Sequence, residues 1–314
     1  MKNYILPLLI ALFAFVGHVN AQTSYSMVVE KNDGGKVTIP TADIKQISFE
    51  ENTDNPSLFQ GPKRIFGNNQ LKAMGCYSDY DGSERYEFTY NDKGYVTKIH
   101  YVKSDEIRDY VFEYKSDGIM YYEWRNGVLH ERFPVIIGKN GFVSSIKPGD
   151  RALYTMEYND KDQLINMSFI ETDKEGNVED SETLNLTWHN DDLEQSGWYE
   201  EGHQDDYPVL ISYTTPTLDA IDNIAGVMLY YDAMGTDVDD CELMYYAGFL
   251  GKGTKRLPLT WTNTDSVYDI GDSKRGKNGN NTWTLDNAGR VIKLVNVRAW
   301  GNGNTETRTF YWEW

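Results

Sequence analysis

Apolar and polar residues alternate along short stretches of the chain, and polar turns rich in Asn, Asp and Gly separate these stretches. Tyr86, Phe88 and Tyr90 occupy every second position of one such stretch. Glu87 and Thr89 lie between them. Successive side chains of a β-strand point to opposite faces of its sheet, so this period of two predicts a strand with one buried, aromatic face. The Asn-Asp-Lys-Gly sequence that follows tolerates positive φ and predicts a hairpin turn.

This strand-turn-strand unit is repeated along the chain. Further copies lie at residues 109–118, 135–143, 154–164, 184–191 and 283–294. A succession of hairpins forms an antiparallel meander, and such a sheet must curl, close or pack on another element to bury its aromatic face. We therefore predict a mainly β protein in which the meander curls into a partial or closed barrel.

Residues 218–250 depart from the period of two. Leu218, Ile221 and Ala225 recur at helical spacing, and a second apolar run occupies residues 241–250. Apolar residues three or four positions apart form one face of a helix. We predict one or two short helices in this segment, packed against or inside the curled sheet.

The first residues have the features of a signal peptide. Lys2 precedes an apolar run at residues 5–16 that is too short to span a bilayer, and the small-residue pattern Val-Asn-Ala precedes Gln22. The predicted organisation is a signal peptide at 1–21, a β-hairpin module at 22–50, a linker at 51–62, and a hairpin-repeat domain at 63–314 with a helical insertion at about 218–250.

Charge and cysteine content narrow the classes of function. The formal net charge is −18, and cleavage of the signal peptide removes Lys2 but no acid, so the mature chain repels nucleic acid. We predict no nucleic acid partner and no membrane span after cleavage. Cys76 and Cys241 form no CxxC pair and the histidines form no HExxH pattern, so we predict neither a metal site nor a cofactor.

No nucleophile or phosphate-binding motif stands between a predicted strand and a predicted helix, so we predict no catalytic residues. One enzymatic alternative stays open. Glu200, Glu201, Asp205 and Asp206 follow Trp198 closely. Two carboxylates placed across a cleft hydrolyse glycosidic bonds, so a hydrolase that uses paired carboxylates on glycans is the alternative hypothesis.

Clusters of Tyr and Trp favour binding. Tyr121, Tyr122 and Trp124 form one cluster, and Trp198 with Tyr199 forms another. Aromatic side chains rimmed by carboxylates and amides can stack on sugar rings or bury peptide side chains, although they also fill sheet cores. We take these residues as candidate binding residues, with a glycan or a peptide as candidate partner. We expect an exported, non-catalytic binding or scaffold protein of the periplasm or cell surface.

Two parts of the chain resemble known families. Residues 27–31 and 44–49 resemble a leader module of exported proteins of gut Bacteroidetes. The repeats, together with Tyr-Ala-Gly-Phe-Leu-Gly-Lys-Gly-Thr-Lys-Arg-Leu-Pro at residues 246–258, resemble the Bacteroidetes domain of unknown function 4595, which is described as having a porin-like fold. The resemblance runs from about Gly61 to the C-terminus. It implies a barrel fold and an exported location, without an activity or catalytic residues.

A porin-like fold raises the further alternative of an outer-membrane barrel. The C-terminal residues 310–314, Phe-Tyr-Trp-Glu-Trp, resemble the terminal strand of such barrels. A membrane-spanning strand needs about 9–11 residues and an apolar outward face. The alternating stretches run about five to seven residues and carry Glu, Lys and Thr on the second face. This pattern favours a barrel outside the membrane.

Overall fold

A computed structural model of the protein describes residues 26–30, 36–40, 61, 63–78, 82–115, 118–200, 209–228, 241–263, 276–300 and 303–314. The chain divides into two compact units, Met1–Asp54 and Asn55–Trp314. The first contains the antiparallel hairpin of β1 (Ser26–Glu30) and β2 (Lys36–Pro40), which confirms the predicted hairpin there. The predicted signal peptide, residues 44–49 of the leader-like module and most of the predicted linker lie outside the described residues.

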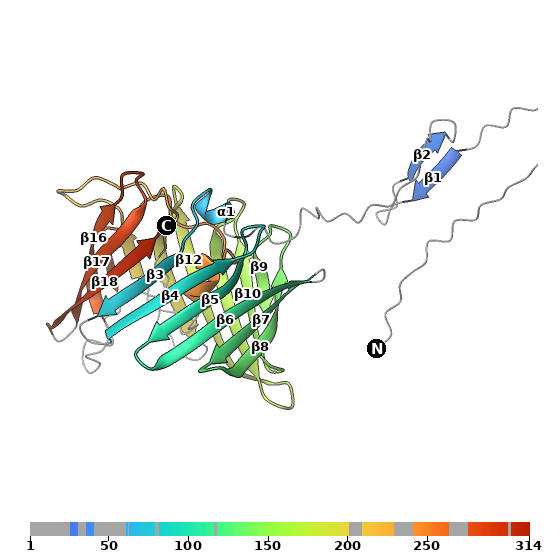
Figure 1. The fold of residues 1–314 in the computed structure, drawn as a ribbon, viewed down its shortest axis with the longest axis horizontal. Helices are drawn as coiled ribbons and strands as arrows, with labels where there is room; N and C mark the ends of the chain where they lie inside the picture. The colour runs from blue at the N-terminus through green and yellow to red at the C-terminus, as the bar shows by residue number, and fades with distance from the viewer. Residues whose placement is uncertain are drawn as a thin grey trace, which may run out of the picture. The chain divides into compact units, whose positions relative to one another are not determined.

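The second unit is a closed antiparallel barrel in which each strand pairs with the next along the chain, and β18 returns to pair with β3 (Figure 1). This confirms the predicted meander and closes it. The barrel strands of the described residues are β3 (Ala73–Ser78), β4 (Gly82–Tyr90), β5 (Val96–Lys103), β6 (Glu106–Lys115), β7 (Gly118–Arg125), β8 (Val128–Ile137), β9 (Val143–Ile146), β10 (Ala152–Tyr158), β11 (Leu164–Thr172), β12 (Val178–His189), β13 (Asp192–Glu200), β14 (Val209–Ser212), β15 (Thr260–Asn263), β16 (Gly276–Leu285), β17 (Val291–Trp300) and β18 (Thr305–Glu313).

The alternation predicted for β4 is the observed one. Phe88 is buried, and Tyr86 and Tyr90 pack against the same core inside the barrel. Glu87 and Thr89 are exposed on the outer face. The aromatic face therefore lines the interior, as the period of two requires.

The repeated turns share one hydrogen-bonding pattern. In the turn at 91–95 the side-chain oxygen of Asn91 accepts hydrogen bonds from the backbone N–H groups of Lys93 and Tyr95, both at 3.0 Å. Gly94 closes the turn with φ of 82°, which a residue without a Cβ adopts at little cost. Equivalent turns begin at Asn159, Asp173 and Asp286. The Asn and Asp residues between the strands thus form the turns that reverse the chain.

A second repeated feature ties neighbouring strands together at one rim. The hydroxyl of Tyr114, at the end of β6, donates a hydrogen bond of 2.8 Å to the carbonyl of Val96, at the start of β5. The same bond, from an aromatic side chain to a carbonyl at the start of the preceding strand, joins Tyr90 to Leu71, Tyr158 to Val143, Trp188 to Leu164, Tyr213 to Leu193, Trp283 to Pro258 and Trp314 to Val291. We call these bonds the rim latches.

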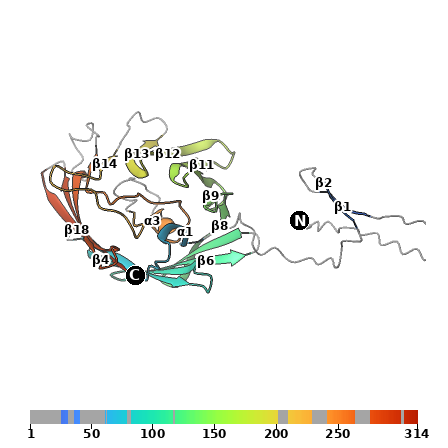
Figure 2. The same ribbon diagram turned by 90° about the horizontal axis from the view of Figure 1, so that it is seen from above.

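The interior at the latched rim is filled by the segment that breaks the repeat. Two short helices, α1 (Lys63–Phe66) and α3 (Cys241–Tyr246), lie inside the ring of strands (Figure 2). Tyr245, Tyr246 and Phe249 are fully buried there. This confirms that a helical insertion plugs the sheet. The helical spacing of Leu218, Ile221 and Ala225 does not produce a helix, because residues 218–228 form turns and loops. Buried Asn223 holds this loop by hydrogen bonds to the backbone of Val227.

The predicted strand lengths are also wrong, since β6 has 10 residues, β12 has 12 and β17 has 10. Strand length therefore does not argue against a membrane-spanning barrel. None of the helices that the structure describes is long and apolar enough to cross a membrane.

Candidate binding site inside the barrel

We call α1, α3 and the buried residues that follow α3 the plug. The 246–258 segment, which carried the family resemblance, holds the plug at the latched rim. Arg256 donates a hydrogen bond to the buried carboxylate of Asp192 through its guanidinium and a second one, of 2.8 Å, through its backbone N–H. Two ion pairs, from Arg64 at 2.5 Å and Lys252 at 3.4 Å, converge on Asp162. These contacts join the plug to the turns between strands, so the segment closes the latched end of the barrel.

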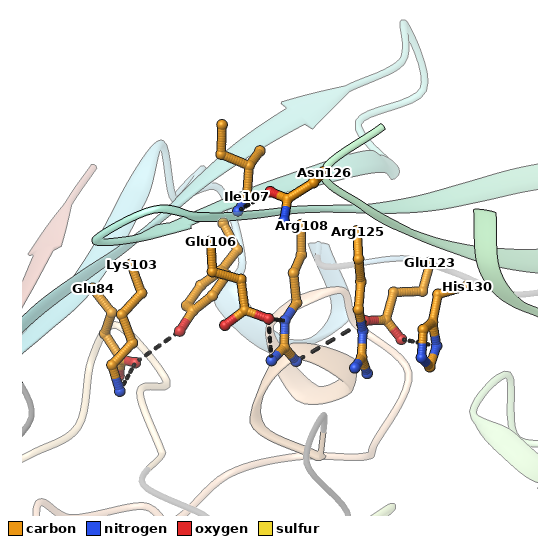
Figure 3. A network of polar contacts seen from close by, with 10 residues as sticks. Glu84, Lys103, Glu106, Ile107, Arg108, Glu123, Arg125, Asn126 and His130 are labelled. Atoms are coloured by element: carbon orange, nitrogen blue, oxygen red, sulfur yellow. Dashed lines mark hydrogen bonds and ion pairs between the residues drawn. The ribbon is translucent and has the colours of Figure 1, made fainter. Parts of the chain in front are cut away.

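Charged side chains line the interior on the other side of the plug. On each of β4, β6 and β7 the inward row is aromatic or apolar beside the plug and becomes charged toward the opposite rim. Glu84 lies two residues before Tyr86, Arg108 two before Tyr110, and Glu123 two after Tyr121, on the same face of each strand. We call the charged residues of this wall, Glu84, Lys103, Glu106, Arg108, Glu123, Arg125 and His130, the inner ladder (Figure 3).

The sheet register builds the inner ladder by placing opposite charges side by side. Lys103 is directly opposite both Glu84 and Glu106, and Arg108 is opposite Arg125. The like-charged arginines are held apart by carboxylates, because Arg108 binds Glu106 at 2.7 Å and Arg125 binds Glu123 at 2.5 Å. Glu84 lies 4.0 Å from Lys103. The basic and acidic groups of the inner ladder therefore alternate across five strands, β4 to β8.

Glu123 is the buried centre of this arrangement, with only 2% of its surface exposed. Besides Arg125, it lies 4.0 Å from Arg108 Nη1 and 3.8 Å from His130 Nδ1. Arg125 uses its Nε for Glu123, and its terminal nitrogens Nη1 and Nη2 make no hydrogen bond to the part of the chain that the structure describes. The terminal edge of this guanidinium therefore stays available to a ligand.

Hydrogen bonds within the inner ladder favour the ionised forms of three of its members, Glu106, Arg108 and Arg125. The hydrogen bond from Arg108 lowers the pKa of Glu106. Burial is the largest single effect on Arg108 and lowers its pKa, but the interactions with Glu106 and Tyr110 together outweigh burial, so the net pKa is raised. The hydrogen bond to Glu123 likewise raises the pKa of Arg125. Glu106, Arg108 and Arg125 are thus fixed charges within the inner ladder.

A buried polar group continues this wall on β16–β18. Glu306 accepts hydrogen bonds at Oε1 from Ser78 at 2.8 Å and from Arg308 at 2.7 Å. Asn296 donates a hydrogen bond of 2.6 Å to Asn281. Glu306 Oε2 and the indole Nε1 of Trp261 are buried and make no hydrogen bond to any residue that the structure describes. A buried polar atom without a partner is costly, so both atoms are ready to receive a ligand or a water molecule.

A small cavity lies on the inner face of β18, β3 and β4, where the aromatic and the charged halves of the interior meet. Its lining residues are Met74, Gly75, Cys76, Glu84, Tyr86, Phe310 and Trp312. The indole N–H of Trp312 is bonded to Tyr246 of the plug at 3.1 Å. The cavity therefore has an aromatic side fixed by the plug and an acidic side supplied by the inner ladder. Within the residues that the structure describes, no group of three His, Cys, Asp or Glu side chains is placed to hold a metal ion.

The aromatic residues chosen from the sequence are distributed over both faces of the barrel. Tyr121 is buried inside and stacks on Phe133 at 4.5 Å between ring centres. Tyr122 lies on the outer face, where its hydroxyl donates a hydrogen bond of 2.7 Å to Glu113, and Trp124 is exposed there. The structure therefore separates Tyr121 from the other two.

Trp198 and Tyr199 are successive residues of β13, opposite Leu184 and Thr183 of β12. Their side chains, like the carboxylates of Glu200, Glu201, Asp205 and Asp206, lie outside what the structure describes, so the roles assigned to them stay predictions. The inner ladder was not predicted. It could have been found from the alternation of side chains along a strand, because a charged residue two positions from an inward-facing aromatic residue must also face inward.

Comparisons with known proteins give a fold without an activity. A family model described as a domain of unknown function (DUF4595) with porin-like fold matches residues 137–293. No curated protein matches the sequence. Among solved structures, a porin-like protein from Bacteroides uniformis matches with 16% identity and a TM-score of 0.57, over 77% of this chain and 96% of that one. A porin-like protein from Bacteroides vulgatus matches with 12% identity and a TM-score of 0.49, over 78% and 99%. At these identities the similarity concerns the fold alone.

Proposed function

Because the chain belongs to the family described as a domain of unknown function with porin-like fold, we propose its role from its own geometry: an exported, non-catalytic binding protein that holds a small polar ligand inside the barrel. The site is the half of the interior that lies beyond the plug and is lined by the inner ladder, Glu306 and Trp261. The single observation that carries this proposal is a barrel closed by a plug at one end and lined with oriented hydrogen-bonding groups beyond it.

Stability alone does not account for the inner ladder. Partly exposed ion pairs contribute about 0–1 kcal/mol each, and apolar side chains would fill the same inward positions, as they do nearer the plug. A buried carboxylate such as Glu123 is costly unless it is paired. Charges fixed in orientation by such pairing are what selective recognition of a polar ligand needs.

The outer face of the barrel supports a location in water. Lys98 and His100 both contact Asp109 on the outside of β5 and β6, at 2.9 and 2.7 Å. Arg85 binds Glu313 on the outside of β4 and β18 at 2.7 Å. An outward Arg or Lys costs about 2–4 kcal/mol at the middle of a bilayer, so this face suits an aqueous compartment. The predicted signal peptide and the porin-like Bacteroides structures are consistent with a periplasmic or cell-surface protein.

A thermal-shift screen of the chain from Gln22 onward against small polar compounds tests this proposal. A ligand that binds the folded state raises Tm by mass action. Glu84→Gln alters the cavity wall without changing side-chain size, so it should abolish the shift that a bound compound produces. Glu87→Gln, three residues along the same strand but on the outer face, is the matched control and should keep it. A shift lost in the control and kept in Glu84→Gln would contradict the site.

A further inference from the structure

We infer that the ligand of this site is a neutral, hydroxyl-rich molecule, a sugar or a closely related polyol, bound along the inner wall between Trp261 and Glu306. This inference rests on the proposed function and names its ligand class. It follows from the two open polar atoms, from the charge pattern of the wall and from the rings of the cavity.

The two atoms, Trp261 Nε1 and Glu306 Oε2, are buried without a hydrogen-bonding partner among the described residues, and they require opposite hydrogen-bonding roles. The indole Nε1 of Trp261 can only donate, and Oε2 of the ionised Glu306 can only accept. An anionic ligand would satisfy the indole but would be repelled by the carboxylate, and an ammonium group would do the reverse. A hydroxyl group both donates and accepts, so a ligand with several hydroxyls can satisfy both atoms.

The register places these atoms on one continuous strip of the wall. Trp261 is opposite Gly279, Gly279 is opposite Arg298, and Arg298 is opposite Glu306. A Cβ on Gly279 would lie 2.1 Å from Trp261 Nε1, so the absence of a side chain there lets the indole lie across β16. The guanidinium of Arg298 stands 5.8 Å from the centre of the indole ring. One extended ligand can therefore contact the whole strip.

The charge pattern also disfavours a charged ligand. Each base of the inner ladder stands beside an acid, and Glu131 lies opposite Glu123 as a further carboxylate. A charged ligand gains little net Coulomb attraction from such a balanced wall, and it loses hydration on entry. A neutral ligand loses less hydration on entry and can still accept a hydrogen bond from a fixed donor such as the Trp261 indole.

The rings of the cavity suit the apolar faces of a sugar. Tyr86, Phe310 and Trp312 line the cavity beside Glu84, and Tyr86 is held against Tyr101 with ring centres 4.8 Å apart. Fixed aromatic faces next to a carboxylate offer stacking and a hydrogen bond to the same molecule. A peptide could use the rings as well, so it is treated as a competing outcome.

Calorimetric titration of the chain from Gln22 onward, with four probe sets, tests the inference. The sets are neutral hexoses with their disaccharides, the matching amino sugars, the matching uronic acids, and uncharged tripeptides. We expect saturable binding in the neutral sugar set, at least about tenfold tighter than any amino sugar or uronic acid, since one lost or repelled hydrogen bond corresponds to about that factor.

Two variants locate the binding. Trp261→Phe removes the indole donor, and Glu306→Gln replaces the open acceptor with an amide donor; each should weaken neutral sugar binding by about tenfold. Glu87→Gln should leave it unchanged, and circular dichroism melting of all three verifies folding. If Glu306→Gln fails to fold, the effect of Trp261→Phe on sugar binding alone decides whether the ligand contacts this strip.

The outcomes separate the ligand class from the proposed function. Binding of amino sugars, uronic acids or tripeptides as tightly as neutral sugars, with the same loss in Trp261→Phe, overturns the ligand class and leaves the interior as the binding site. Sugar binding that both variants retain also overturns it. Absence of binding by all four sets overturns the ligand class, and the thermal-shift screen against other polar compounds then decides the proposed function by itself.

Discussion

Glu306 is the residue whose titration reports on the inner wall. Burial, the largest single effect, opposes its ionisation, but the hydrogen bonds from Arg308 and Ser78 together with the charges of Arg308 and Arg298 outweigh burial and lower its pKa below the ordinary value of 4.5. A carboxyl whose pKa is lower in the folded state than in the unfolded state adds stability above the unfolded pKa. That stability is lost as the pH falls through the folded pKa.

The resulting prediction concerns acid stability. Glu306→Gln should destabilise the protein at neutral pH, and the difference in unfolding free energy between the two proteins should shrink as the pH falls below about 4.5, because protonated Glu and Gln are alike in charge. Urea unfolding at a series of pH values measures this. A difference that stays constant from neutral to acid pH would contradict the ionised, hydrogen-bonded state of Glu306.

Residue-scale expectations from sequence succeeded where apolar side chains mark a face. Tyr86 and Phe88 identify the inner face of β4, because aromatic side chains favour the face that excludes water. Glu84 and Arg108 share the inner face but have the residue types of a surface, so their positions could not be inferred from polarity. The candidate binding residues Tyr121 and Tyr122 are adjacent in sequence, and adjacency on a strand places side chains on opposite faces.

At the scale of elements, the rim latches explain why an aromatic residue recurs near the strand ends. Each latch supplies a donor to a carbonyl at the start of the neighbouring strand, where the ladder of backbone hydrogen bonds ends. Burial raises the pKa of Tyr114, so its hydroxyl stays protonated as the donor to Val96. The repeat in the sequence is therefore a repeat of hydrogen bonds as well as of hydrophobic burial.

This account predicts a measurable cost for one hydroxyl. Tyr114→Phe leaves the Val96 carbonyl without its partner and should lower the unfolding free energy by about 1–2 kcal/mol. Tyr122→Phe removes a hydroxyl bonded to Glu113 on the outer face and should cost less than about 0.5 kcal/mol, because water replaces that bond. If Tyr114→Phe and Tyr122→Phe lower the unfolding free energy equally in chemical denaturation, the rim latches stabilise the barrel no more than a surface hydrogen bond does.

Element boundaries were predicted less well, for a physical reason. The inner face of β6 changes from Arg108 to Tyr110 along its length, so the hydrophobic alternation covers only part of the strand and the predicted strand is too short. The spacing of Leu218, Ile221 and Ala225 imitates a helix. Yet Leu218 is exposed and Ala225 is buried, and the loop is held by Asn223 rather than by helical hydrogen bonds.

At the scale of the whole barrel, the two ends of the interior serve different purposes. The latched end is packed with the rings of Tyr245, Tyr246 and Phe249 and is clamped by Arg256 on Asp192. The other half presents oriented charges and two open polar atoms. The family description and the porin-like Bacteroides uniformis structure concern the fold alone, and the division of the interior is what supports the proposed ligand site.

The central claim is that the ligand lies inside the barrel, and indole resonances test it most directly. The chain contains eight tryptophans, of which Trp261 faces the unplugged interior and Trp188 forms a rim latch with Leu164. Proton–nitrogen NMR should be recorded while the compound with the largest thermal shift is titrated into the protein. The account predicts that the Trp261 indole signal moves to saturation and that the Trp188 signal stays in place. A saturating compound that leaves the Trp261 signal unmoved would contradict it.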